Sequence, residues 1–313
     1  YFKLIIQGGL PLIEVTLRSE GALECLRRIK KAYPEMAVGA GTVLSVEQLN
    51  AAAQAGADYV VAPGFNKKVV ARAQELGLYA YTLTDHCECQ KWPDRYCERV
   101  HRAWQEMTEA PVPQGLRFYR GIELGQPNQD PDSAALALEG RDYDFVIGSI
   151  HNIRGYEDFF YLDYSQVEPG FIDALLTTYW EEEREVIAWG QFDALGHLTY
   201  PLRYIEGDHG IPVDLSKHQE AIDGIFRALI DSGKALEVNT SGLRQKIGRA
   251  LPDLPLVRRY RELGGELVTL GSDAHCVEDL GKGIEAGMDL LREAGFRRFA
   301  VYEQHKPILL PLE

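Results

Sequence analysis

Short apolar runs alternate with amphipathic stretches along the whole chain, and this alternation predicts strands followed by helices. In the first quarter, we expect strands at residues 12–17, 36–43 and 59–62, and helices at about 20–32, 46–55 and 67–75. Further along, apolar runs end at residues 86, 123, 151, 197 and 275. Strands that alternate with helices are typical of a parallel α/β fold. The pattern therefore predicts an α/β barrel of parallel strands.

Polar residues with metal-binding side chains stand at the ends of the later runs. They are His86, Glu123, His151, His197, Asp273 and His275. Because the carboxyl ends of barrel strands meet at one rim, residues remote in sequence can share one pocket there. Imidazole and carboxylate together suit zinc, manganese or iron, and a carboxylate can bridge two cations. We therefore predict a site for one to three divalent metal ions that carries out hydrolysis.

Composition narrows the choice of partners. The 313 residues are 45% apolar, enough for one barrel or two smaller domains. A formal net charge of -14 disfavours nucleic-acid binding, although local arginines and metal ions still allow a small phosphorylated substrate. No apolar run approaches the roughly 20 residues that span a bilayer, and no signal peptide is recognisable at the start. The five cysteines lack a disulfide-scaffold spacing, which favours the cytoplasm. The oligomeric state is not predicted.

From about residue 79 to the carboxyl terminus, the sequence resembles histidinol-phosphate phosphatases of the polymerase and histidinol phosphatase (PHP) family. The blocks that carry the resemblance are Leu83-Thr-Asp-His-Cys-Glu-Cys89, Gly121-Ile-Glu-Leu-Gly-Gln-Pro127, Gly148-Ser-Ile-His-Asn-Ile-Arg-Gly155, Leu195-Gly-His-Leu-Thr-Tyr-Pro201, Glu237-Val-Asn-Thr-Ser-Gly-Leu-Arg244 and Gly271-Ser-Asp-Ala-His275. The resemblance implies a distorted seven-stranded, TIM-like barrel and hydrolysis of L-histidinol phosphate to histidinol and phosphate.

The resemblance also implies roles for single residues. Glu123, His151 and His197 match one complete metal position, and Glu123 would bridge to a second position that retains Asp273. His86 and His275 would be two of three ligands at a third position. Glu123, His151 and Asp273 are the expected catalytic residues. The family opens with a strand bearing His-x-His, and no histidine precedes His86 in this chain. We therefore expect metal at the Glu123 position but reduced or abolished activity.

Three arginines are candidates for binding the substrate phosphate through their planar donors. Arg154 follows His151 closely, and the family context favours it most. Arg120 and Arg244 are equally well explained as ordinary surface or salt-bridge residues. Further along, Glu181-Glu-Glu-Arg-Glu185 is predicted to form a solvated helical face.

The segment from about residue 8 to 78 resembles a different barrel, 2-keto-3-deoxy-6-phosphogluconate (KDPG) aldolase. The matching blocks are Gly8-Gly-Leu-Pro-Leu-Ile-Glu-Val-Thr-Leu-Arg18, Val38-Gly-Ala-Gly-Thr-Val-Leu44 and Ala57-Asp-Tyr-Val-Val-Ala-Pro-Gly-Phe65. By this resemblance, Glu14 matches the acid/base carboxylate, whereas Arg18 and Thr42 match substrate contacts. The aldolase forms a Schiff base through a lysine on its sixth strand, and this chain stops matching before that strand. Class I aldolase activity is therefore a rival hypothesis with its nucleophile missing.

Together the two resemblances predict a chimera with an aldolase-like segment at residues 1–78 and a phosphatase barrel at residues 79–313. Aldolase βα units would replace the opening unit of the phosphatase, since each such unit presents a strand inward and a helix outward. Glu14 is then either a relic of aldolase chemistry or a replacement for a lost metal ligand. A non-catalytic barrel chimera, engineered or recombined, is the third hypothesis.

Overall fold

The chain divides into two compact units in the computed structural model. One comprises residues 1–66 with 275–278, and the other comprises residues 67–274 with 279–313. The structure describes residues 12–16, 22–32, 37–41, 55, 59–60, 80–92, 96–109, 117–165, 167–168, 170–275 and 279–312. The helix expected at 67–75 and nearly all of the one at 46–55 lie outside these residues. The predicted boundary at residue 78 stays a prediction.

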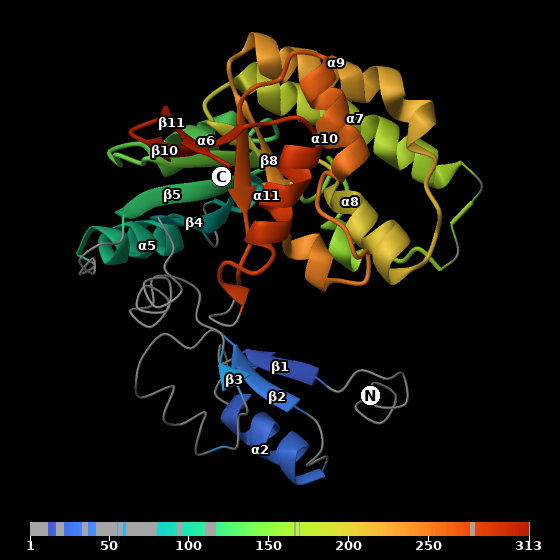
Figure 1. The fold of residues 1–313 in the computed structure, drawn as a ribbon. Helices are drawn as coiled ribbons and strands as arrows, with labels where there is room; N and C mark the ends of the chain where they lie inside the picture. Colours follow the sequence, from blue (N-terminus) through green and yellow to red (C-terminus); the bar gives the residue numbers. More distant parts are fainter. Residues whose placement is uncertain are drawn as a thin grey trace. The chain divides into compact units, whose positions relative to one another are not determined.

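The first unit contains a three-stranded parallel sheet in the order β1-β2-β3 (Figure 1). Its elements are β1 (Leu12–Thr16), α2 (Ala22–Ala32), β2 (Ala37–Gly41) and β3 (Tyr59–Val60). Leu26 and Ile29, three positions apart in α2, are buried. This spacing gives the helix one apolar face, as the sequence predicts. Glu14 lies in β1, whereas Arg18 and Thr42 lie outside the described residues.

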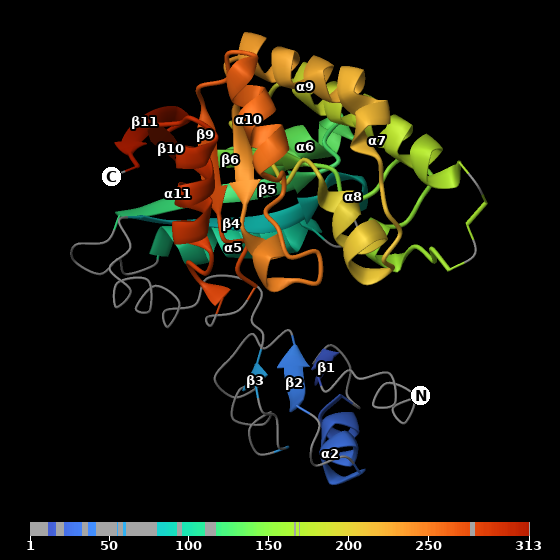
Figure 2. The ribbon, with the colours of Figure 1, turned by 45° about the vertical axis from the view of Figure 1, so that its right-hand side comes forward.

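The second unit is built on six parallel strands that pair in sequence order. They are β4 (Ala80–Glu88), β5 (Arg117–Gly125), β6 (Phe145–Ser149), β7 (Ala194–Leu195), β8 (Ala235–Asn239) and β9 (Val268–Gly271). The strands are parallel, so all their carboxyl ends point the same way, and the sheet curls in the manner of a barrel (Figure 2). The distorted TIM-like fold inferred from the sequence is confirmed.

Helices connect these strands and pack against them. The α-helices are α5 (Cys97–Glu109), α6 (Pro131–Leu138), α7 (Phe171–Trp189), α8 (Tyr200–Leu202), α9 (Gln219–Asp231), α10 (Leu254–Glu262) and α11 (Ile284–Glu293). Short helical turns are η1 (Cys89–Lys91), η3 (Phe159–Tyr161), η4 (Arg203–Asp208), η5 (Leu215–His218) and η6 (Ser241–Arg244). An antiparallel hairpin of β10 (Arg298–Glu303) and β11 (Lys306–Pro311) ends the unit. No helix in the described part of the chain is long and apolar enough to cross a membrane.

Local sequence explains where several helices begin and end. Asp130 caps α6 by accepting a hydrogen bond from the backbone N–H of Ser133 at 3.0 Å, and Pro131 occupies the first turn. Asp253 likewise accepts from the N–H of Leu256 at the start of α10. Gly190 ends α7 at a φ of 78°, a conformation that glycine adopts at little cost.

Helix α7 corrects one expectation about the surface. It lies against both β6 and α9, so its sides are covered, and Tyr179 and Trp180 are among its buried residues. The acidic stretch at 181–185 was predicted to face solvent, but Glu182 and Glu183 are buried. The prediction holds for Glu181, Arg184 and Glu185, which are exposed. It was wrong for the other two, because a helix packed on two sides buries positions that a composition argument treats as exposed.

Candidate metal centre

Three predicted ligands converge at the carboxyl ends of neighbouring strands. Glu123 lies near the end of β5, His151 lies two residues beyond β6, and His197 lies two residues beyond β7. Each comes from a different strand of the parallel sheet, and all three are buried, with 4–6% of their surface exposed. The parallel pairing therefore brings together residues that are separated by 74 positions in sequence.

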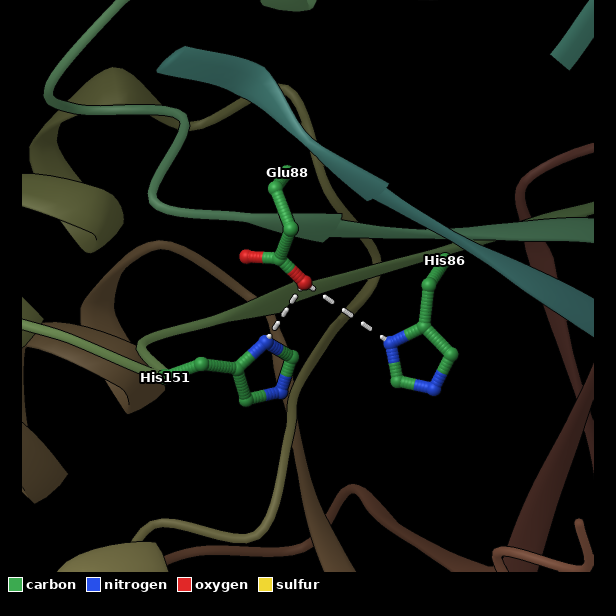
Figure 3. Close-up of side chains that lie close together, drawn as sticks. All are labelled: His86, Glu88 and His151. Atoms are coloured by element: carbon green, nitrogen blue, oxygen red, sulfur yellow. Dashed lines mark hydrogen bonds and ion pairs between the residues drawn. The ribbon is translucent and has the colours of Figure 1, made fainter. Parts of the chain in front are cut away.

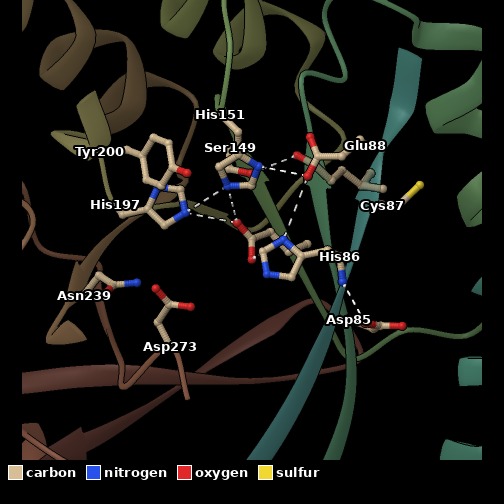
Figure 4. A network of polar contacts seen from close by, with 12 residues as sticks. Asp85, His86, Cys87, Glu88, Ser149, His151, His197, Tyr200, Asn239 and Asp273 are labelled. Carbon is tan, nitrogen blue, oxygen red and sulfur yellow. Dashed lines mark hydrogen bonds and ion pairs between the residues drawn. The ribbon is translucent and has the colours of Figure 1, made fainter. Parts of the chain in front are cut away.

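The ligand atoms of these three residues lie within 4.8 Å of one another, and Figure 4 shows how the rings of His151 and His197 face each other. The Nε2 atoms of His151 and His197 are 3.3 Å apart. Oε1 of Glu123 lies 3.1 Å from the first nitrogen and 3.0 Å from the second. Two imidazole nitrogens and a carboxylate oxygen this close together could bind one cation. Zinc is commonly bound by histidine nitrogens and carboxylate oxygens. The residues present therefore fit a divalent metal ion.

Charge within the cluster keeps the carboxylate ionised. Burial alone would raise the pKa of Glu123, but the charge of His86 and hydrogen bonds from His151 and His197 outweigh it and hold that pKa well below its usual range. Burial would also lower the pKa of His151, but the neighbouring carboxylates of Glu88 and Glu123 hold it well above its usual value. Each acid and imidazole in this cluster therefore changes the pKa of its neighbours.

The end of β4 supplies two more side chains to this cluster. His86 Nδ1 lies 3.5 Å from Oε2 of Glu123, its neighbour across the β4–β5 ladder. Two residues further along the strand, Glu88 places Oε1 3.0 Å from His151 Nδ1 and 4.0 Å from His86 Nδ1. These three residues form a second group that could hold a cation, since their ligand atoms lie within 4.8 Å of one another (Figure 3).

A buried acid supports His197 from the next strand. Glu237 in β8 accepts a hydrogen bond at 2.8 Å from the backbone N–H of His197 and another at 3.3 Å from the side chain of Asn239. Burial raises the pKa of Glu237 to about 7, and the nearby carboxylate of Glu123 adds to this effect. His197 needs this support because its φ of 21° lies outside the regions that side chains prefer.

Asp273, after β9, also has a positive φ, of 48°. In Figure 4 its carboxylate lies beside Asn239, on the same side as His197. Arg203 places one terminal nitrogen 3.3 Å from Asp273 and 2.7 Å from the hydroxyl of Ser241. His275 is exposed and belongs by its contacts to the first unit, so its role as a ligand stays a prediction.

The three arginines predicted to bind phosphate contact other groups of the protein. Arg154 is half-exposed and makes an ion pair of 2.6 Å with Glu185. Arg120 lies on the same strand as Glu123, three residues earlier, so the two side chains leave opposite faces of the sheet. Its guanidinium stacks on Trp104 at 5.2 Å, under α5. This position argues against a phosphate contact for Arg120.

Arg244 lies nearer the proposed ligands. Its terminal nitrogens donate to the backbone carbonyls of Ser272 and Asp273, each at 2.7 Å, and its Nε lies 3.2 Å from Asp279. These contacts fix the loop that carries Asp273, so the guanidinium is already committed to the protein. Its role in binding substrate stays a prediction.

Sequence reasoning missed three side chains of this pocket: Glu88, Glu237 and Arg203. A signal for Glu88 was present, because residues two apart on a strand share a face and His86 was already a candidate. Glu237 is the first residue of a matching block. Arg203 lies six residues after His197 in a helical turn that no strand pattern marks.

Comparison with known protein families divides the chain in two. The PHP domain model matches residues 63–241. A probable histidinol-phosphatase of Thermotoga maritima is 30% identical over 233 residues, covering 74% of this chain and 87% of the relative. A histidinol-phosphatase of Lactococcus lactis is 25% identical over 250 residues, covering 77% and 89%. The crystal structure of L. lactis histidinol phosphate phosphatase with zinc, L-histidinol and phosphate superposes with a TM-score of 0.58 at 22% identity, covering 78% of this chain and 93% of that one.

The beginning of the chain matches another family. The model for KDPG and KHG aldolase covers residues 2–81. The KHG/KDPG aldolase of Escherichia coli K12 is 42% identical over 73 residues, which is 23% of this chain and 34% of the aldolase. The chain therefore spans about a third of the aldolase relatives it matches. Both resemblances inferred from the sequence are confirmed.

Proposed function

Because the chain belongs to the PHP domain family, we propose that it is a metal-dependent phosphomonoester hydrolase whose substrate is L-histidinol phosphate. The observation that carries the proposal is the convergence of Glu123, His151 and His197, three buried side chains whose ligand atoms lie 3.0–3.3 Å apart. The name of the relatives supplies the substrate, and the pocket supplies the chemistry. The two relatives named for this activity match 74% and 77% of the chain.

The proposed cation is zinc, manganese or iron, held by the two Nε2 atoms and Oε1 of Glu123. A divalent ion there would polarise a phosphoryl oxygen and lower the pKa of a water molecule. Glu123 also faces His86 through Oε2, so it has one oxygen directed to each side. This arrangement suits a carboxylate that serves two neighbouring cations. Occupancy by one ion is the minimum that the proposal requires.

Arg203 is the side chain that we assign to the substrate phosphate. It is largely buried, and its Nε has no hydrogen-bond partner within the part of the chain that the structure describes. Its guanidinium also lies 5.0 Å from the ring of Tyr200, which in turn lies 5.0 Å from the rings of His151 and His197. A phosphate oxygen would satisfy this donor beside the metal ligands.

Phosphate release tests the proposal. Chain purified without chelator is assayed with L-histidinol phosphate and added zinc or manganese, and its metal content is measured alongside. We expect metal-dependent release that is reduced, because no His-x-His strand precedes His86. His197→Ala should abolish it, since that variant removes one of three ligands. The control Glu181→Gln changes an exposed acid and should leave release unchanged. Metal binding without release would favour the non-catalytic alternative, whereas a chain that binds no metal would reject the hydrolase.

Aldolase activity has less support. The aldolase match ends at residue 81, and the resemblance places the Schiff-base lysine on a later strand of that family. Glu14 lies in β1 of the first unit, and Arg18 and Thr42 lie outside the described residues, so their roles stay predictions. Incubation with pyruvate and borohydride should leave the mass of the chain unchanged. A stable adduct on a lysine would revive this hypothesis.

A further inference from the structure

One acid of the pocket has no role in the function proposed so far. Glu88 comes from the end of β4 and is mostly buried, with 15% of its side chain exposed. Its Oε1 lies 3.0 Å from Nδ1 of His151, the ring nitrogen that does not face Glu123 and His197 (Figure 3). His151 therefore presents one nitrogen to the proposed cation and the other to a carboxylate.

The surroundings hold the Glu88 carboxylate in this position. Gly125 is its partner across the β4–β5 ladder, and a Cβ on Gly125 would lie only 2.3 Å from Oε2 of Glu88. The buried amide of Gln126 has its nitrogen 2.6 Å from the same oxygen in the orientation that satisfies both its polar atoms. In that orientation its oxygen accepts from the backbone N–H of His151 at 2.6 Å. Both oxygens of Glu88 are thus engaged, and the same amide links Glu88 to His151.

We propose that Glu88 is a positioning residue: it accepts a hydrogen bond from the Nδ1–H of His151 and so leaves the lone pair on Nε2, the nitrogen that would bind the metal. A neutral imidazole has one N–H and one lone pair, and the group bonded to the N–H decides which nitrogen can bind a cation. A carboxylate in this place also makes the imidazole a better donor. The inference rests on the proposed function, because it requires His151 to be a ligand.

The same geometry argues against an independent cation bound by His86, Glu88 and His151. The group meets the distance requirement, but its ligand atom on His151 would be Nδ1. Nε2 of that ring faces Glu123 Oε1 at 3.1 Å. A ring that binds metal through both nitrogens must lose its last proton, which neutral imidazole does not do readily near pH 7. The hydrogen bond is therefore the simpler arrangement.

Zinc affinity tests this role through a measurement that does not depend on activity. Wild type, Glu88→Ala, Glu88→Gln and the exposed control Glu181→Gln are titrated with zinc against a chromophoric chelator. Loss of a carboxylate behind a metal-binding histidine weakens affinity by roughly 10–100-fold. We expect the upper end for Glu88→Ala and the lower end for Glu88→Gln, whose amide oxygen can still accept the hydrogen bond from Nδ1–H. Glu181→Gln should match the wild type.

Two further readouts separate positioning from a ligand role and from simple packing. At saturating zinc, Glu88→Ala should bind as many ions per chain as wild type. In ¹⁵N-histidine NMR spectra, the zinc-bound wild type and Glu88→Gln should show a slowly exchanging Nδ1 proton on His151, which Glu88→Ala lacks. Loss of one zinc per chain would make Glu88 a ligand and overturn the inference.

Failure of the positioning role can be distinguished from failure of the proposed metal centre. A wild type that binds zinc together with Glu88 variants of unchanged affinity overturns only the positioning role. A wild type that binds no zinc overturns the metal centre and the positioning role together. If Glu88→Ala does not fold, the wild type still tests the inference, because the absence of a slowly exchanging Nδ1 proton on His151 in the zinc-bound wild type would reject it.

Discussion

Replacing the buried acid Glu183 in α7 should make the protein more stable in a way that depends on pH. The residue is fully buried, and among the described residues neither of its carboxylate oxygens has a hydrogen-bond partner. Burial raises the pKa of Glu183 from 4.5 to about 8, against smaller lowering effects of the Tyr179 hydroxyl and of His151. Between these two values the folded chain binds a proton that the unfolded chain has released. Stability therefore falls as pH rises from about 4.5 to 8.

The size of the effect follows from the width of that window. Each pH unit inside it corresponds to ~1.4 kcal/mol, so Glu183 costs about 3 kcal/mol of stability between pH 5 and pH 7. Glu183→Gln has no such group and should lose this part of the slope. Urea unfolding at pH 5 and pH 7 measures the difference for wild type, Glu183→Gln and Glu181→Gln. The last variant makes the same substitution at an exposed position of α7. Parallel stability curves for wild type and Glu183→Gln would refute the reasoning.

Three other variants follow from the packing of the second unit. Gly271→Ala should weaken zinc binding and lower the melting temperature, because its Cβ would lie 2.1 Å from Oε1 of Glu237, which supports His197; an unaltered melting temperature would show that Glu237 moves without cost. Arg203→Met should raise KM for the phosphate ester by about tenfold or more, because a charged hydrogen bond to the substrate is lost, and zinc affinity should stay the same. An unchanged KM in steady-state kinetics would contradict the assignment. Phe226→Ala should cost roughly 3–5 kcal/mol in urea unfolding, because the ring is fully buried between α9 and its neighbours, and a loss under 1 kcal/mol would mean that the site collapses around the cavity.

The sequence predicted which side chains converge because strand ends obey a simple rule. His151 and His197 each end an apolar run, and parallel pairing brings such ends to one rim whatever their separation in sequence. Side chains that reach the rim from inside a strand are harder to predict. Glu88 was missed because the apolar run ends at His86, whereas the strand β4 continues for two more residues.

Predictions about surface and charge were weaker for a different reason. Whether an acid or arginine faces solvent depends on what packs against its helix or strand, and no local pattern records that. Glu183 was expected in solvent and is buried; it lies on α7, a helix that packs against β6 and α9. Arg120 was a candidate for a phosphate contact or for an ordinary surface or salt-bridge role, and the alternation of side chains along β5 turns it away from Glu123.

The backbone at His197 and Asp273 adopts positive φ angles, of 21° and 48°, that glycine or asparagine would tolerate more easily. A directed-evolution screen that rewards heat resistance alone should therefore enrich glycine at both positions, and the selected variants would lack two of the side chains proposed to bind metal. Attempts to raise the stability of this protein should therefore keep His197 and Asp273 unchanged and seek stabilising substitutions in the helices around the sheet.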